Sequence, residues 1–133
     1  MYETEVRKAR DYLLSVQNRD GSFPSSDEGL NAHYKTPCAL LEVGEVDAAG
    51  RLLDWIKAYQ LQPDGDFRGK AAKFCSTWHH NFYTYANSWI IIGAQRMLRF
   101  DISMPALAFI ASLQDEPTGG AITPRPGAMR RIT

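Results

Sequence analysis

A turn pattern that recurs along the chain constrains the fold more than any other feature. Three times a helical stretch is followed by Gln and a short turn that contains Gly, at residues 17–23, 62–67 and 114–120. The glutamines are Gln17, Gln62 and Gln114, and successive ones are separated by roughly 50 residues, about the length of two helices with their loops. The sequence therefore predicts a protein built from repeated helix pairs.

The segments before the three glutamines have the periodicity of amphipathic helices. Val6, Ala9, Leu13 and Val16 lie at spacings of three and four and form one apolar stripe. The second and third segments follow the same rule, with Leu52, Leu53 and Ile56, and with Leu107, Ile110 and Leu113. Ser103 is the expected N-cap of the third helix, with Pro105 in its first turn. We expect these three helices to lie on the outside.

Two further helices of a different character are expected between the outer ones. One begins at Thr36-Pro37 and ends at Gly44, and the other covers residues 84–98. The run 89–94 is apolar all round, as in a helix enclosed by neighbours. Its isoleucines would also suit a strand, but a single strand would have no pairing partner. We predict an all-α fold with outer and inner helices alternating over residues 1–118, and a tail at 119–133.

The turns resemble those of a known family. Gln17, Gly21 and Phe23 match the Gln-x-x-x-Gly-x-Phe repeat motif of squalene/hopene cyclases and protein prenyltransferase β subunits. Gln62, Gly65 and Phe67 repeat it with one residue fewer. The resemblance implies an α/α toroid, in which the Gln side chain hydrogen-bonds near a helix end and the aromatic ring stacks beside it.

The chain departs from this family in its catalytic motifs and in its length. Asp64-Gly65-Asp66 lacks the last acid of the cyclase Asp-x-Asp-Asp motif, and neither Asp-Asp-x-x-Asp nor Asp-x-Cys is present. The chain holds about two and a half helix pairs where the family toroid has six, so we expect an incomplete arc. Exposed inner helices would leave large apolar side chains in water, at about 1.5–3 kcal/mol each. The arc should therefore associate through its inner face, most simply as a two-fold homodimer, unless the chain is a piece of a longer protein.

Aromatic and histidine side chains gather just before the two predicted inner helices, where the loops of a toroid border its cavity. Aromatic rings can stabilise a carbocation or stack on a sugar, and histidine is the usual acid or base near neutral pH. The candidate acid–base residues are His33, His79 and His80. The candidate ligand-binding residues are Tyr34, Trp78, Tyr83, Tyr85, Asn87 and Trp89.

Other interpretations of these residues stay open. The aromatic and histidine side chains could instead cap and pad the inner helices, which is a purely structural role. Cys75 and His79 share a helix face but are two ligands only, so no metal site is expected, and no cofactor is indicated. Cys75 lacks the oxyanion hole and the orienting carboxylate that a nucleophile needs.

Three functions follow from these patterns. The first is an aromatic-lined pocket for an apolar or isoprenoid ligand, with the reaction unspecified. The second is a non-catalytic binding or assembly module. The third is a fragment of a carbohydrate-active toroid enzyme, which tyrosine and histidine side chains converging on a groove open at both ends would favour.

The composition narrows the partners and the compartment. Fifteen basic residues balance fifteen acidic ones, which argues against nucleic-acid and anionic-membrane partners because both select positive surfaces. Residues 1–10 are charged and no apolar core follows them, so no secretory signal is expected. The longest apolar run, residues 89–94, is far shorter than a membrane span. We therefore expect a cytoplasmic protein without a membrane span.

Overall fold

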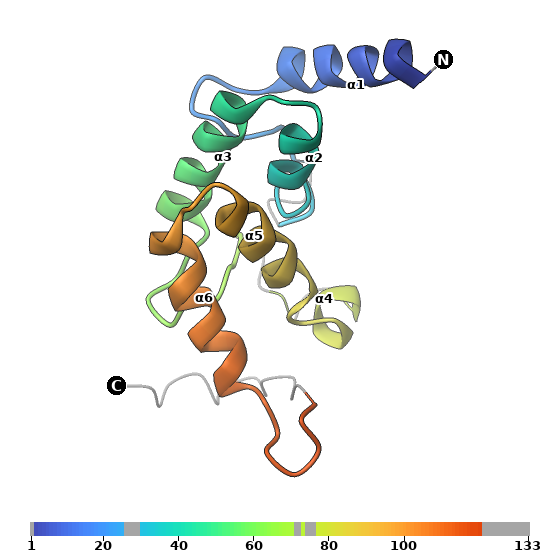
Figure 1. Cartoon of the computed structure of the whole chain (residues 1–133). Helices are drawn as coiled ribbons and strands as arrows, with labels where there is room; N and C mark the ends of the chain where they lie inside the picture. The colour runs from blue at the N-terminus through green and yellow to red at the C-terminus, as the bar shows by residue number, and fades with distance from the viewer. Residues whose placement is uncertain (1, 26–29, 71–72, 74–76, 121–133) are drawn as a thin grey trace.

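The computed structural model describes residues 2–25, 30–70, 73 and 77–120, with the main chain only at His79 (Figure 1). Throughout these ranges the fold is all-helical, as predicted, and contains no strand, only an isolated bridge between Leu61 and Phe67. None of the helices in this described part is long and apolar enough to cross a membrane. The helices are α1 (Tyr2–Val16), α2 (Thr36–Glu42), α3 (Val46–Tyr59), α4 (Thr77–Asn81), α5 (Tyr85–Arg96) and α6 (Phe100–Ser112).

The helices form two hairpins that share a core. α2 packs on α3, α5 packs on α6, and α2 and α5 contact each other (Figure 1). This order of contacts places α2 and α5 between α3 and α6. The largest apolar side chains buried between the layers are Leu30, Leu40, Leu52, Leu53, Ile56, Phe67, Ile90 and Ile102.

Most predicted helix ends agree with the structure, and one cap does not. α2 begins at Thr36 with Pro37 in its first turn, and Gly44 follows it with a φ of 80°. α6 begins at Phe100 rather than at Ser103, so the predicted cap is wrong. The side chain of Ser103 is buried and accepts a hydrogen bond from Gln95 Nε2 at 2.9 Å. The buried Ile102 extends the apolar stripe one turn further toward the N-terminus than the cap prediction allowed.

α1 is a well-formed helix that the rest of the chain barely covers. None of its residues is fully buried, although Leu13 and Val16 are half-buried against the core. The N-terminal half extends away from the two hairpins (Figure 1), and Val6 is exposed. The predicted apolar stripe therefore exists, but only its C-terminal end has a surface to pack on.

The first two Gly-containing turns have the same backbone. The amide of Asn18 donates to the carbonyl of Ser22, and the amide of Gln62 donates to that of Asp66, at 2.9 and 2.8 Å. Asp20 and Asp64 each accept the amide two residues further on, at 3.0 Å in both turns. Gly21 and Gly65 follow with φ of 92° and 89°, a region that disfavours side chains. The turns are therefore structural repeats of an Asp-Gly-x-Phe unit.

Each of these glycines lies against the next outer helix. A Cβ on Gly21 would stand 2.3 Å from the carbonyl oxygen of Arg51 in α3, and a Cβ on Gly65 would stand 2.2 Å from that of Pro105 in α6. No real side chain fits at such a distance. The absence of a side chain at these two positions therefore allows each repeat to stack on the following one.

The prediction that the three glutamines occupy equivalent positions in their turns is wrong for Gln62. The hydrogen bonds align Gln62 with Asn18, so that Leu61 occupies the place of Gln17. Gln17 Nε2 donates to the carbonyls of Gly21 and Ala48, both at 3.0 Å, whereas Gln62 Nε2 donates to Gln60. Gln114 Nε2 donates to Gly119 and so follows Gln17. The Asp-Gly-x-Phe unit, rather than the glutamine, marks the first two repeats.

Substitution of Gly65 should destabilise the protein far more than substitution of Gly44. Both glycines have positive φ, but a Cβ on Gly44 meets nothing within 4 Å. We expect Gly44→Ala to cost ~1–2 kcal/mol for the left-handed backbone alone. Gly65→Ala should cost at least about 2 kcal/mol more, because the helix must move away. Urea denaturation measures both; equal losses would contradict the stacking contact.

Candidate functional site

The structure distributes the predicted site residues over three places. Tyr34, Trp78, Tyr85 and Trp89 lie together on the surface of the inner helices, whereas Tyr83 and Asn87 are buried beneath it. His33 lines a pocket elsewhere. The side chain of His80 is exposed, and that of His79 lies outside the described residues, as does Cys75. The predicted residues therefore do not form one site.

The first place is an aromatic face made of Tyr34, Trp78, Phe82, Tyr85 and Trp89. Tyr85 is its centre, with edge-to-face contacts to Tyr34, Trp78 and Trp89 at centroid distances of 5.9, 6.0 and 6.5 Å. Trp78 and Phe82 are both 50% exposed. The expected loop before α5 contains the short helix α4, which carries Trp78, and Phe82 directly follows this helix. A group of partly exposed aromatic rings of this kind is typical of a surface that contacts a ligand or a partner.

Lys35 adds a positive charge to the aromatic face. Its ammonium lies 5.7, 5.4 and 5.5 Å from the ring centroids of Tyr34, Tyr85 and Trp89, which is cation–π distance. A hydrogen bond with Lys35 lowers the pKa of the Tyr85 hydroxyl. The face therefore combines apolar rings with one cation at its edge.

The second place is a buried polar cluster of Asp66, Lys73, Tyr83 and Asn87. Lys73 Nζ donates to Asp66 Oδ1 at 2.6 Å and to Asn87 Oδ1 at 2.5 Å. Tyr83 Oη donates to Asp66 Oδ2 at 2.7 Å, and Asn87 Nδ2 donates to Asp66 Oδ1 at 2.8 Å. All four residues are buried. The cluster ties the second turn to α5 through one carboxylate.

Burial dominates the protonation behaviour of this cluster. It lowers the pKa of Lys73, while the charge and hydrogen bond of Asp66 act in the opposite direction. Burial and then the hydrogen bond to Asp66 raise the pKa of Tyr83 far above its ordinary value. The hydrogen bonds satisfy the carboxylate from several sides, as a buried charge requires. The geometry fits a structural clamp.

Removal of the lysine should cost much more than removal of a surface ion pair. Lys73→Met removes the closer of the two cations of the buried Asp66 carboxylate and leaves Arg68, whose Nη1 is 3.8 Å from Oδ2. We therefore expect a loss of about 3 kcal/mol in the free energy of unfolding. The double variant Lys73→Met/Asp66→Asn should recover part of it. Glu42→Gln removes the exposed ion pair with Arg96 and should cost less than ~1 kcal/mol. Similar losses for Lys73→Met and Glu42→Gln would contradict the clamp.

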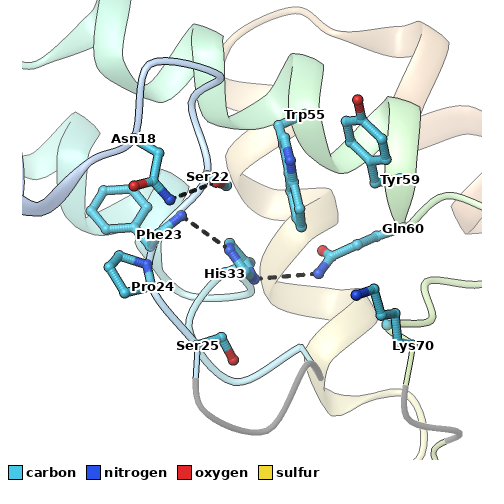
Figure 2. Close-up of a pocket in the computed structure, with 11 residues that line it drawn as sticks. Asn18, Ser22, Phe23, Pro24, Ser25, His33, Trp55, Tyr59, Gln60 and Lys70 are labelled. Carbon is cyan, nitrogen blue, oxygen red and sulfur yellow. Dashed lines mark hydrogen bonds between the residues drawn. The ribbon is translucent and has the colours of Figure 1, made fainter.

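The third place is a pocket between the first turn and the C-terminal half of α3, called the α3 pocket below (Figure 2). Its volume is about 350 Å³, within the range of small-ligand sites. Trp55 and Tyr59 stand side by side along one wall, at a centroid distance of 5.3 Å. The facing segment contributes Asn18, Ser22, Phe23, Pro24 and Ser25, and Gln60, Gly69 and Lys70 complete the lining with the buried His33.

His33 is held rigidly within the α3 pocket. Its ring stacks on Trp55 at 4.5 Å, and its Nε2 accepts the amide of Phe23 at 3.2 Å. The proton of the neutral ring is therefore on Nδ1, which lies 3.3 Å from the Gln60 amide. Rotation of the Gln60 amide by half a turn from the orientation in Figure 2 would bring Oε1, which has no partner in that orientation, to face this N–H. The contacts to Phe23 and Gln60 favour a positioning role for His33 over proton transfer.

Sequence reasoning missed most of these contacts, for two different reasons. Trp55 and Tyr59 lie on the polar side of an outer helix, where large aromatics are not part of the expected core stripe. Sequence reasoning considered Asp66 in the comparison of Asp64-Gly65-Asp66 with the cyclase motif and assigned no partner to its charge. The alignment of the two Asp-Gly-x-Phe turns could have indicated the partners of Asp66. Asp66 occupies the position of Ser22, which is buried, and a charge at a buried position needs a partner.

The described residues give no sign of a metal centre. No three His, Cys, Asp or Glu side chains in that part of the chain converge on one point. A comparison with known protein families, with curated proteins and with solved structures finds no match in any of the three.

Proposed function

We propose that this protein is a non-catalytic helical-repeat module that binds a carbohydrate in the α3 pocket. The observation that supports this proposal best is the convergence of Trp55, Tyr59 and His33 on one concave site (Figure 2). Of the three functions that the sequence left open, a carbohydrate-related function is the one that aromatic and histidine side chains meeting in one pocket favour.

The lining of the α3 pocket suits a sugar ring. Exposed aromatic faces carry partial negative charge, which attracts the polarised C–H groups on one face of a pyranose. Opposite the rings are amide and hydroxyl side chains, those of Asn18, Ser22 and Ser25, which match a ligand rich in hydroxyl groups. A pure hydrocarbon would cover these polar groups without bonding to them. The volume fits a mono- or disaccharide.

The same lining supports binding better than hydrolysis. Glycosidases commonly use a pair of carboxylates on either side of the scissile bond. Among the described residues that line the α3 pocket there is no Asp or Glu, and the contacts of His33 position it rather than leave it poised as a base. We therefore propose recognition of the sugar without a chemical step.

Tyr59→Ala should weaken sugar binding, and Tyr12→Ala should not. The two tyrosines are equally exposed, at 67% and 66%, but Tyr12 lies on α1. Loss of one aromatic contact of ~1 kcal/mol predicts a fall of about fivefold in affinity. Saturation-transfer NMR with glucose, N-acetylglucosamine and cellobiose measures binding, with dissociation constants expected near ~1 mM. No transfer from any of the three sugars, or equal loss in both variants, would overturn the proposal.

The aromatic face supports a second candidate function, an apolar ligand with an anionic head, such as a prenyl diphosphate. The rings of Trp78, Phe82 and Tyr85 would cover the isoprenoid chain, and Lys35 at their edge would pair with the phosphate. This candidate keeps the expected isoprenoid ligand but places it on the aromatic face instead of in a pocket, and it assigns no acid or base.

Thermal shift measurements separate the parts of that ligand. We expect farnesyl diphosphate to raise the melting temperature more than farnesol or inorganic pyrophosphate, since only it meets both the rings and the cation. Lys35→Gln should remove the advantage of the diphosphate, whereas Lys8→Gln on α1 should leave it unchanged. An equal response in the two variants would exclude Lys35 as the phosphate partner.

We also propose that the stacked hairpins form part of an α/α-toroid-like arc. The two turn contacts, Gly21 on α3 and Gly65 on α6, support a regular progression from one repeat to the next. Self-association through the inner-helix face, most simply as a two-fold homodimer, stays a prediction of this arrangement. The exposed Ile92 on α5, close in sequence to Trp89, supports this self-association, because contact with a second copy would remove both apolar side chains from water.

A further inference from the structure

The two internal turn contacts define a rule for stacking. In each, the glycine of a turn lies on the backbone of the next outer helix, at Arg51 in α3 and at Pro105 in α6. Arg51 lies ten residues before Leu61, which occupies the place of Gln17 in the second turn. The residue ten before Gln17 is Arg7. The rule therefore identifies the place on α1 where the turn of a preceding repeat would lie.

The third turn resembles the first with one residue more, and among the described residues it contacts no following helix. Gly119 has a φ of 68°, and Gln114 Nε2 donates to its carbonyl at 3.2 Å, as Gln17 does to that of Gly21. The nearest neighbour of a Cβ on Gly119 would be Gln114 itself, at 3.9 Å. The contact that Gly21 and Gly65 make with a following helix is thus absent at Gly119 within the described residues.

α1 presents a surface that matches this turn. Tyr2, Glu3, Val6 and Arg7 surround a hollow on its exposed side. In the first contact Arg51 donates to Gln17 Oε1 at 2.9 Å, and α1 has an arginine at the same position. Arg7 forms no ion pair within the described part of the chain.

Charge complements this shape at Arg7. The third turn carries Asp115 and Glu116, while α1 contributes Arg7 and Glu3 to the hollow and has Lys8 next to Arg7 in sequence. The two surfaces lie at opposite ends of the molecule, with α1 at the top and the turn after α6 at the bottom (Figure 1). They cannot meet within one chain of this shape.

We propose that the third turn of one molecule docks on α1 of a second copy, which continues the repeat stack head to tail. Gly119 lies against the α1 backbone at Arg7, and the Arg7 guanidinium donates to Gln114 Oε1. Because two different surfaces meet, the contact is heterologous and builds a ring or a chain of copies rather than an isolated two-fold dimer. The occupant of the α1 hollow is this protein itself.

Two variants that each damage one surface test the proposal. Arg7→Glu reverses the charge on α1, and Gly119→Asn places a side chain in the contact while Asn still tolerates positive φ. Glu5→Lys, on the opposite side of α1, is the control for charge reversal. Circular dichroism checks that each variant folds, and sedimentation velocity up to ~1 mM protein measures association.

We expect the wild-type protein and Glu5→Lys to exceed the 15.0 kDa monomer mass and each damaged variant to remain monomeric. An equimolar mixture of Arg7→Glu and Gly119→Asn should form a complex of two chains, because each supplies the surface that the other lacks. A monomeric wild type, variants that associate as the wild type does, or a mixture that stays monomeric would overturn the proposal. Association that is unchanged in both variants but lost in Trp78→Asp would assign the interface to the aromatic face instead.

Discussion

Two glycines lying against carbonyl oxygens determine how the helices of this protein stack. Gly21 and Gly65 end turns of the same conformation, and the backbone of the next outer helix occupies the space that a Cβ would need. Each contact sets the distance between one hairpin and the next, so the core side chains of α2, α3, α5 and α6 meet. The repetition of a backbone contact, rather than of any polar side chain, makes the structure periodic.

The repeats share a backbone but differ in what their side chains do. In the first turn Ser22 bonds locally to Asp20, and the following segment opens onto the α3 pocket with His33 at its base. In the second turn Asp66 takes the place of Ser22, and its charge recruits Lys73, Tyr83 and Asn87 into a clamp. Two turns of the same geometry therefore differ in their surroundings. The first borders the α3 pocket, and the second is bonded to the buried polar cluster.

The sequence was sufficient for the helices and insufficient for the site. Periodicity placed α2, α3 and α5 well because each buries an apolar stripe, although α5, expected to be enclosed on all sides, leaves Ile92 exposed. The alignment of the three glutamines was wrong at Gln62. Gln62 is the same residue type as Gln17, but the hydrogen bonds of the turn place it at the position of Asn18. Tyr83 and Trp89 lie on the same short segment, yet one is buried on Asp66 and the other is half-exposed. That difference depends on tertiary packing, which no local pattern encodes.

The stacking contact is the central claim, and nuclear Overhauser spectroscopy tests it most directly. A Cβ on Gly21 would lie 3.0 Å from the Cβ of Arg51, and one on Gly65 would lie 3.1 Å from that of Phe109. The account predicts strong cross-peaks from the α protons of Gly21 to the β protons of Arg51, and from those of Gly65 to the β protons of Phe109. If both pairs of cross-peaks are absent from a well-resolved spectrum of the folded protein, the turns do not dock on the following helices and the repeat account is wrong.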